Sequence, residues 1–552
     1  MELYPIVTTN AACWPGMIES GYQLLGGGKV SELAPKLPHL GLADVLFMTS
    51  IMSIPRERRP WGIVTWLSDA FLLSRPALYN LAERVRERLL PNPVAGYLSI
   101  DAGDLLEEES RAEKEAQSKR NRLARTILTA AFPGKMALRP MQQMLVESLD
   151  KSPSVGWLSE LLKEASQKAK EILAEIDFSA MGPLIVLRDE TFFQDQPILM
   201  LVDPVSSVIV QAVVAPDRQA DTWALLLLLA QDQGVHFAGL VEDMARMYAS
   251  SCRHAELKVS IQKDTWHIQR DGKRLLIALE KSALHASQTV FALEKKLLKA
   301  WNEELFLDKY IAAVALEEER YAQVECFACW FDHFCDACEI VDLPSGCIRD
   351  KETNHWLLNQ SLTALETIDQ ADVQKWVKSL RSHQHQLLVW MEWLTPALTV
   401  WQERLAHLLP EPLAQKEFIR LVARLWRSRQ ALVNGHVGWR RFVQETSTSL
   451  DACLLASPAL QESAQQLSDI LDAASRTTSL IESINGLLKQ FLHNRRSFPD
   501  TDSLQNYLNL FVLWHNMRVY QRGKRQGQSP YQRAGIPLPS SDWLDLLGFP
   551  RV

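Results

Sequence analysis

Apolar residues recur at helical spacing in the amino-terminal third of the chain, in two runs joined by a short turn. The second run follows Ser74, a suitable N-cap, and Leu78, Leu81 and Val85 fall on one face of the helix that it predicts. The whole segment, Trp61 to Leu89, has the layout of a helix-turn-helix unit, with two surface helices of a bundle as the alternative. The side chains that this layout would turn toward DNA are Arg75, Tyr79, Asn80 and Arg84.

A similar pattern follows a charged connector. The helical runs ALRPMQQMLVESL and VGWLSELLKEASQKAKEIL are separated by DKSPS, in which Ser152 and Pro153 suit the cap and first turn of a helix. We therefore expect a second helix-turn-helix-like unit. Its lysines would meet phosphates or form an ordinary solvated helix face, and they are Lys163, Lys168 and Lys170.

At Pro183 the pattern of apolar residues changes from helical spacing to the alternation typical of β-strands. PLIVLRDE, PILMLVD and SVIVQAVVA are β-rich runs broken by turn residues, which predicts three strands in a meander. An apolar helix, Thr222 to Gln231, and a fourth strand ending at Asp243 follow. Asp189 and Asp243 would then end strands that lie side by side, and carboxylates at strand ends of an α/β sheet commonly form a site. Glu190, Asp203 and Glu242 are nearby acids that could be confused with them.

A third carboxylate, Glu482, lies on a predicted helix far along the chain. The apolar stripe of that helix consists of Leu480, Ile484, Leu487, Leu488 and Phe491. Glu482, Asn485, Lys489 and Arg496 fall on a different face. Such a helix buries its aliphatic side against a sheet and presents a carboxylate and two cations to an anion. DNA beside a pair of hard cations fits that face.

Composition narrows the kinds of DNA contact. The 552 residues allow roughly three or four domains, and a net charge of −7 excludes a uniformly basic coat. Local patches remain, because Lys and Arg outnumber Asp and Glu by ten to five from Arg476 to the end. The longest aliphatic run, Leu225 to Leu229, is far shorter than the roughly 20 residues of a membrane span. No membrane contact and a cytoplasmic location are expected.

The residues around the three acids resemble the DDE transposases of bacterial insertion sequences. Asp189 lies in a strand followed by ETFF, Asp243 ends a strand and opens a helix, and Glu482 precedes Lys489 in the spacing of the E(6)K signature. The segment FVLWHNMRVYQRGKRQGQSPYQRAGI is similar to the tail of these enzymes. The likeness covers roughly residues 183 to 267 and 476 to 536. The arginine that often stands four residues before the glutamate is absent, since position 478 is Thr; whether Arg476 substitutes for it stays open.

The resemblance implies an RNase H-like core in which Asp189, Asp243 and Glu482 hold two Mg²⁺ ions, with Mn²⁺ as a substitute. AELKVSIQKDTWHIQ would supply the fifth strand, and its Asp264 and His267 are similar to the [C/D]xxH motif of families with an interrupted core. The interruption would be an all-α insertion after residue 268. Insertions of this kind hold DNA or stack on a flipped base, for which Trp390, Trp393 and Trp401 are candidates if they are not simply core.

The expected fold class is therefore an α/β RNase H-like core interrupted by a large all-α insertion and preceded by all-α helix-turn-helix domains. The expected boundaries are 1–100 for the first helix-turn-helix domain, 101–180 for the connector and second unit, 181–268 and 476–552 for the two parts of the core, and 269–475 for the insertion. Further DNA contacts are expected from Lys489, Arg495, Arg496, Arg522, Lys524 and Arg525.

The function implied by the resemblance is DNA transposition. The partners would be double-stranded DNA, as terminal inverted repeats and as target, and a second copy of the chain in a homodimeric synaptic complex. The location would be the bacterial cytoplasm, at the nucleoid. Two alternatives remain: a domesticated transposase that regulates by binding DNA without catalysis, and an RNase H-like nuclease that cuts without joining.

The cysteines of ECFACWFDHFCDAC form two CxxC pairs. Cys326, Cys329, Cys335 and Cys338 would suit a four-thiolate zinc site by type. The spacer between the pairs is short, however, and the flanks predict one continuous helix. Small buried thiols on a helix face are the interpretation that we favour over zinc.

Overall fold

The computed structural model describes residues 42–59, 62–89, 102–149, 151–299, 304–342, 344–433, 435, 438, 440–454, 457–493, 495, 497–523 and 525–551. Arg496 and Lys524, two of the expected DNA contacts, lie outside the described residues. The chain divides into two compact units, Met1–Glu113 and Lys114–Val552. No helix in the described ranges combines the length and apolar character needed to cross a membrane.

The first unit is helical in the part that the structure describes. Its helices are α2 (Leu42–Ser53), α3 (Ile63–Ala70) and α4 (Arg75–Leu89), with the short 3-10 turn Arg56–Arg58 after α2. Leu67, Leu78 and Val85 are buried together between the helices. The backbone N–H of Ala77 donates to Ser74 Oγ at 3.3 Å, so Ser74 caps α4 as predicted. Four residues thus separate α3 from α4.

Helices α5 (Ala102–Ala131), α6 (Leu138–Leu149) and α7 (Val155–Ala174) follow. The predicted cap of α7 was wrong by two residues. Ser154, rather than Ser152, accepts a hydrogen bond from Trp157 N at 3.1 Å, because it has extended backbone and stands immediately before the first helical residue. The apolar face of α7 packs on α19, a helix of the core described below, and its lysines are exposed on the other side.

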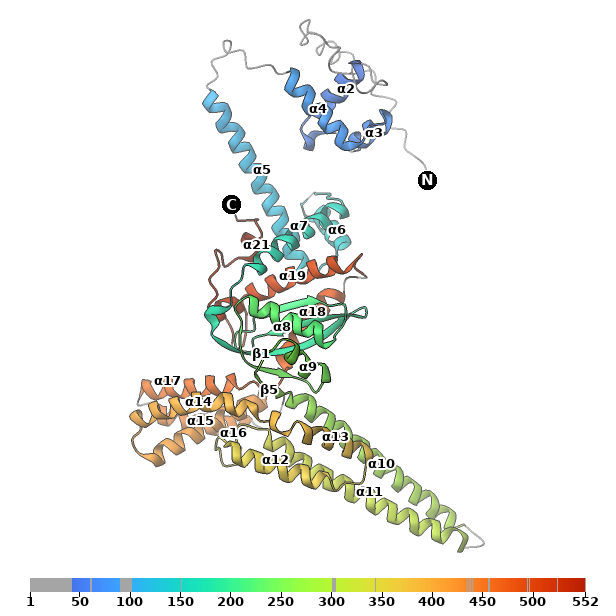
Figure 1. Ribbon diagram of the computed structural model, residues 1–552, viewed down its shortest axis with the longest axis vertical. Coiled ribbons are helices and arrows are strands. Elements are labelled where there is room, and N and C mark those ends of the chain that lie inside the picture. The colour runs from blue at the N-terminus through green and yellow to red at the C-terminus, as the bar shows by residue number, and fades with distance from the viewer. Residues whose placement is uncertain are drawn as a thin grey trace. The chain divides into compact units, whose positions relative to one another are not determined.

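A five-stranded mixed sheet forms the centre of the second unit (Figure 1). The strands are β1 (Pro183–Phe193), β2 (Gln196–Val202), β3 (Ile209–Val214), β4 (His236–Glu242) and β5 (Ser260–Lys263), in the order β3-β2-β1-β4-β5. β1, β2 and β3 are antiparallel neighbours, whereas β1, β4 and β5 run parallel. The predicted meander and both later strands are confirmed.

One prediction about β1 was wrong: Asp189 is not at its end. The β-branched and aromatic residues of ETFF continue the ladder with β2 as far as Phe193, through a hairpin whose two turn residues have positive φ. The parallel ladder with β4 nevertheless stops at Leu187 and Val241. Asp189 therefore lies just beyond the carboxyl end of that ladder, next to the end of β4.

Helices cover both faces of the sheet. α8 (Ala220–Asp232) and α9 (Arg246–His254) lie on one face, where Arg188 of β1 bonds Ser251 and Tyr248. α18 (Ser479–His493) and α19 (Thr501–Met517) contact β1, β2 and β3. α19 is buried nearly all round, between α7 and the sheet, which explains its continuous apolar sequence. The short helices α20 (Pro530–Ala534) and α21 (Trp543–Leu546) complete this part.

The segment between β5 and α18 is helical, apart from one isolated bridge between Val341 and Ile348, in the residues that the structure describes. This confirms the all-α insertion. Its helices have a hydrophobic core of their own. They are α10 (Thr265–Leu297), α11 (Glu304–Ala337), α12 (Lys351–Leu365), α13 (Ala371–Ser382), α14 (Val389–Leu408), α15 (Pro412–Val433), α16 (Arg440–Leu454) and α17 (Pro458–Ala473).

Asn516 fastens α19 to the edge strand β3. Its side chain is fully buried, accepts from Ile209 N at 2.9 Å and donates to Ile209 O at 2.9 Å. The neighbouring His515 approaches Ser207 O at 3.1 Å, and burial lowers the pKa of its ring to about 3. The His-Asn pair in the carboxy-terminal segment therefore has a structural use: Asn516 bonds backbone groups of the edge strand β3, and His515 bonds a carbonyl of the turn that precedes it.

Replacing Asn516 by alanine is expected to lower the stability of the core by about 2 kcal/mol or more, because it leaves two buried backbone groups of Ile209 without partners. Thermal unfolding followed by circular dichroism measures the effect. Asn506→Ala, on the half-buried side of the same helix, is the matched control. Equal melting temperatures for the two variants would contradict this role.

Candidate active site at the carboxyl end of the sheet

The alternation of side chains along β1 separates Asp189 from its neighbours. Arg188 and Glu190 point to the face covered by α9, where Tyr248 Oη donates to Glu190 Oε2 at 2.5 Å. Asp189 points to the face of α18, where Asn485 Nδ2 donates to Asp189 Oδ2 at 2.9 Å. Of the two acids, Asp189 is the one on the same face of the sheet as Glu482.

Asp243 follows the last residue of β4. Its Oδ1 accepts a hydrogen bond from Ala245 N at 2.7 Å, which fixes the carboxylate at the turn into α9. Burial raises the pKa of Asp243, and the negative charge of Glu190 adds to this effect. Burial also raises the pKa of Asp189 to about 7, with further contributions from Glu190, Asp243 and Glu482. Asp243 and Glu482 are thus close enough to Asp189 for their charges to disfavour its ionised form, which is the electrostatic setting that a bound cation relieves.

Glu482 lies in the first turn of α18 and is held by the motif at the start of α10. Its Oε1 is 3.0 Å from His267 Nε2, while His267 Nδ1 is 2.8 Å from Asp264 Oδ2. Burial alone would lower the pKa of His267, but the hydrogen bond to Asp264 and the charges of Asp264 and Glu482 raise it overall. The contacts from Asp264 to His267 and from His267 to Glu482 therefore connect the start of α10, in the helical insertion, to the third acid.

Asp264 is a junction for three parts of the chain. It is the N-cap of α10, accepting from Trp266 N at 2.7 Å and His267 N at 3.1 Å. It also accepts from both the backbone N–H and the hydroxyl of Thr478, just before α18. Burial would raise the pKa of Asp264, but the hydrogen bonds from His267 and Thr478 lower it overall. Thr478, where the resembled family often has arginine, thus helps to place α18 beside α10.

Arg476 does not join the three acids. Its Nη1 donates to Cys338 O at 2.6 Å and lies 3.0 Å from Glu339 Oε2, and its guanidinium stands over the ring of Trp390. These contacts tie the start of the second core segment to the helical insertion. Whether Arg476 substitutes for the arginine that is absent at position 478 was left open by the sequence. In the structure, its partners are Cys338, Glu339 and Trp390, and not the three acids.

The other nearby acids have partners of their own. Glu242 is fully buried between Arg188 and Lys263, with Lys263 Nζ 2.6 Å from its Oε1. Glu190 bonds Tyr248 and lies 3.1 Å from Arg218 Nη1. Asp203 accepts from Ser206 N at 2.8 Å in the turn between β2 and β3. Glu190 and Glu242 therefore pair with Arg or Lys side chains, and Asp203 is held in a turn, whereas Asp189 and Glu482 contact Asn485 and His267.

The chemistry of the donors fits hard cations, since carboxylate oxygens are the ligands that Mg²⁺ and Mn²⁺ prefer. Within the described ranges, no group of three or more His, Cys, Asp or Glu side chains stands in a ready-made metal-binding arrangement. Asp189 and Glu482 are instead engaged by Asn485 and His267. A metal would compete with these two hydrogen bonds.

The expected DNA contacts fall into two groups. On α4, Arg75 donates to Thr65 Oγ1 at 2.8 Å, Tyr79 is 41% exposed, and Asn80 and Arg84 are exposed, so that helix keeps a polar outer face. In the carboxy-terminal segment, Lys489 and Arg522 are exposed. Arg495 lies over the ring of Tyr507, and Arg525 donates to Pro204 O at 3.0 Å, so both have structural partners.

The tryptophans proposed for base stacking are placed differently from one another. Trp390 and Trp401 are buried in the insertion core, and Trp401 Nε1 donates to Ser463 O at 2.9 Å. Trp393 packs against Gly239 of β4 so closely that a Cβ there would lie 2.2 Å from its ring. Sequence reasoning missed Trp266, which is 40% exposed, adjoins His267 and lies under the guanidinium of Arg270. Its position inside the Asp-Thr-Trp-His motif was the available signal.

The cysteine pairs belong to the helical insertion. Cys326, Cys329 and Cys335 lie on the continuous helix α11, and Cys338 follows its last residue. Burial raises the pKa of Cys338 to about 12 and raises that of Cys335 still further. Since thiolate is the metal-binding form, these environments favour neutral thiols packed in a core.

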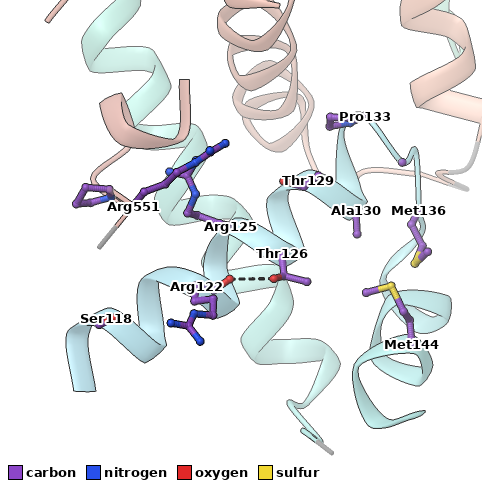
Figure 2. A pocket seen from close by; sticks show the side chains of 12 residues that line it. Ser118, Arg122, Arg125, Thr126, Thr129, Ala130, Pro133, Met136, Met144 and Arg551 are labelled. Carbon is purple, nitrogen blue, oxygen red and sulfur yellow. Dashed lines mark hydrogen bonds between the residues drawn. The ribbon is translucent and has the colours of Figure 1, made fainter. Parts of the chain in front are cut away.

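A pocket of about 700 Å³ lies apart from the acids, between α5, α6 and the last residues of the chain (Figure 2). Met136 and Met144 line one side and Arg122, Arg125 and Arg551 another. Arg125 forms ion pairs with Asp542 and Asp545, which join α5 to α21. None of the three candidate acids lines this pocket.

Neither a protein-family model nor a curated protein sequence matches this chain.

Proposed function

We propose that the chain is a DNA transposase whose core is RNase H-like and whose site is formed by Asp189, Asp243 and Glu482. The observation that carries the proposal is the electrostatic interaction of Asp189, just beyond the parallel ladder of β1 and β4, with Asp243 after β4 and with Glu482 from a helix on the far side of a large insertion. The electrostatic effect of Asp243 and Glu482 on the pKa of Asp189 supports a shared site. The order of strands and helices, with β1 at the centre of a mixed sheet, supports the core.

In this proposal, Asp189, Asp243 and Glu482 supply the oxygen ligands of two Mg²⁺ or Mn²⁺ ions. Bound ions of this kind lower the pKa of an attacking water and stabilise the leaving oxygen in phosphoryl transfer. His267, fixed by Asp264, orients the carboxylate of Glu482. Lys489, exposed seven residues after Glu482 on the same helix, would bind a phosphate of the DNA backbone. A homodimer that joins two element ends belongs to the same proposal.

The proposal is tested with labelled duplex DNA from the ends of the element, incubated with the full chain and Mg²⁺ or Mn²⁺. A transposase both nicks the end and joins the freed 3′-hydroxyl to target DNA. Nicked products without joined products would instead indicate a nuclease. Binding of the ends without any reaction in either metal would indicate a DNA-binding regulator.

His267→Ala is expected to reduce the rate of cleavage by about 10- to 100-fold while leaving DNA affinity unchanged, because Glu482 loses the side chain that orients it. Single-turnover cleavage rates and binding of labelled ends in chelator measure the two quantities separately. His407→Ala, an exposed histidine on α14, is the matched control. Cleavage at the wild-type rate would show that His267 does not position Glu482.

A further inference from the structure

Helix α10 leads directly away from the candidate active site. Its N-cap is Asp264, its third residue is His267, and its 33 residues extend for about 50 Å. One side of the helix is buried against α11, through Leu279, Ala283 and Ala286. Figure 1 shows the two helices running side by side. The opposite side is exposed, and it begins beside Glu482.

That exposed side, which we call the outer face of α10, combines basic and aromatic or aliphatic residues. Its basic members are Arg270, Lys273, Arg274, Lys281 and Lys295, and Lys295 Nζ lies 4.2 Å from the ring centre of Phe291. Its large apolar members are Trp266, Ile277, Leu284 and Phe291, which are 40%, 43%, 55% and 57% exposed. The acids at its edges are Asp271, which pairs with Arg270 and Arg274, and Glu280.

Helix α11, on the other side of the pair, has the opposite charge. Between Glu304 and Ala337 it has eight acidic residues and only two basic ones, Lys309 and Arg320. The two helices therefore direct an anion to α10 and away from α11. Rows of Lys and Arg with interleaved aromatic residues are the usual composition of a nucleic-acid-binding face.

A second copy of the chain fits the outer face less well. Ile277, Leu284 and Phe291 recur at intervals of seven residues, about 10.5 Å along the axis. A coiled-coil seam also needs apolar residues at the intervening positions, but these are Glu280, Ser287 and Glu294, with Lys281, Gln288 and Lys295 one residue further on. The apolar side chains are thus isolated between charges.

We propose that the outer face of α10 is a DNA track, on which backbone phosphates contact Lys273, Arg274, Lys281 and Lys295 and the DNA continues past Trp266 into the active site. The proposal deepens the proposed function, on which the direction of the DNA rests. The track itself concerns only DNA affinity, which is measured without catalysis.

The test compares two variants of the full chain that lose the same charge. The track variant carries Lys273→Gln, Arg274→Gln, Lys281→Gln and Lys295→Gln; the control carries Lys375→Gln, Lys378→Gln, Arg404→Gln and Lys416→Gln, on exposed positions of α13, α14 and α15. Binding of labelled DNA of about 30 base pairs is measured by fluorescence anisotropy in EDTA from about 50 to 200 mM KCl, with a single strand of equal length in parallel.

The track variant is expected to lower the slope of log K against log salt by about 3 to 4 on duplex, since each lost phosphate contact removes about 0.9, and the control by less than 1. A comparable decrease of the slope that is seen only with the single strand would support the track and show that it binds single-stranded DNA. Equal slopes for both variants would overturn it. So would dissociation of a dimer by Ile277→Ser, Leu284→Ser and Phe291→Ser with unchanged DNA binding, which would make the face a protein interface.

The two proposals fail separately. If the slope difference is found but no metal allows cleavage, the track stands and the catalytic role of the acids is wrong. If DNA is cut and joined but the slopes of the two variants agree, the catalytic role stands and the track is wrong.

Discussion

Glu242→Leu is expected to destabilise the core by about 3 to 5 kcal/mol, the largest effect on folding that we predict. The carboxylate is fully buried between Arg188 and Lys263, which are themselves 0% and 3% exposed. Removing it leaves two buried cations with only neutral partners, and an uncompensated buried charge is far more costly than a lost surface pair. Thermal unfolding measures the loss, and failure of the variant to fold would agree with the same account.

Two further variants make this prediction specific. Glu462→Leu, at an exposed position of α17, should change stability by about 0.5 kcal/mol or less. The triple change Arg188→Met, Glu242→Leu and Lys263→Met removes all three charges and should recover much of the loss. A melting temperature for Glu242→Leu equal to that of Glu462→Leu would show that the buried ion pairs do not hold these strands together.

Asp189→Asn is expected to abolish DNA cleavage and, in chelator, to stabilise the fold by about 1 to 3 kcal/mol above pH 7. The pKa of Asp189 is raised by burial from its usual 3.8 to about 7. The folded state therefore holds a proton that the unfolded state has released between these two values, so this carboxyl makes stability fall as pH rises from 3.8 to 7. The side-chain amide of the Asp189→Asn variant has no charge to bury, so its stability does not fall with rising pH for this reason.

The measurement is the melting temperature of wild type and Asp189→Asn from about pH 5 to pH 8 in EDTA, with cleavage assayed on the same preparations. The difference between the two proteins should grow as pH rises from 5 and level off above about 7. An Asp189→Asn protein that is less stable at every pH, or that still cuts DNA, would contradict the assignment. A stable but inactive variant is the combination that a functional acid at a desolvated position should give.

The order of elements was predictable because it follows from local chemistry. β-branched runs around Asp189 and Asp243 gave the strands, and the apolar stripe through Ile484 and Leu488 gave the helix that covers them. The boundaries were less predictable. Ser152 and Ser154 are equally good caps by type, and only the backbone selects Ser154.

The connections between distant segments were not predictable from one sequence. Thr478 N donates a hydrogen bond to Asp264, although the whole insertion separates the two residues in the chain. The contact between Glu482 and His267 also joins the two ends of the insertion. The sequence marked Asp264 and His267 only by resemblance, without their partners. Trp390 and Trp401 show the opposite limit: an indole at helical spacing looks the same in sequence whether it is buried in a core or free to stack on a base.

The most direct test of the central claim is cleavage and joining of labelled element-end DNA in Mg²⁺ or Mn²⁺ by wild type, Asp189→Asn, Asp243→Asn and Glu482→Gln, with Glu462→Gln as the matched control. We predict that wild type and the control cut and join, whereas each of the three variants binds the ends with wild-type affinity and reacts at least about 1000-fold more slowly. Cleavage by any of the three at a rate near that of wild type would contradict the claim that these carboxylates form one active site.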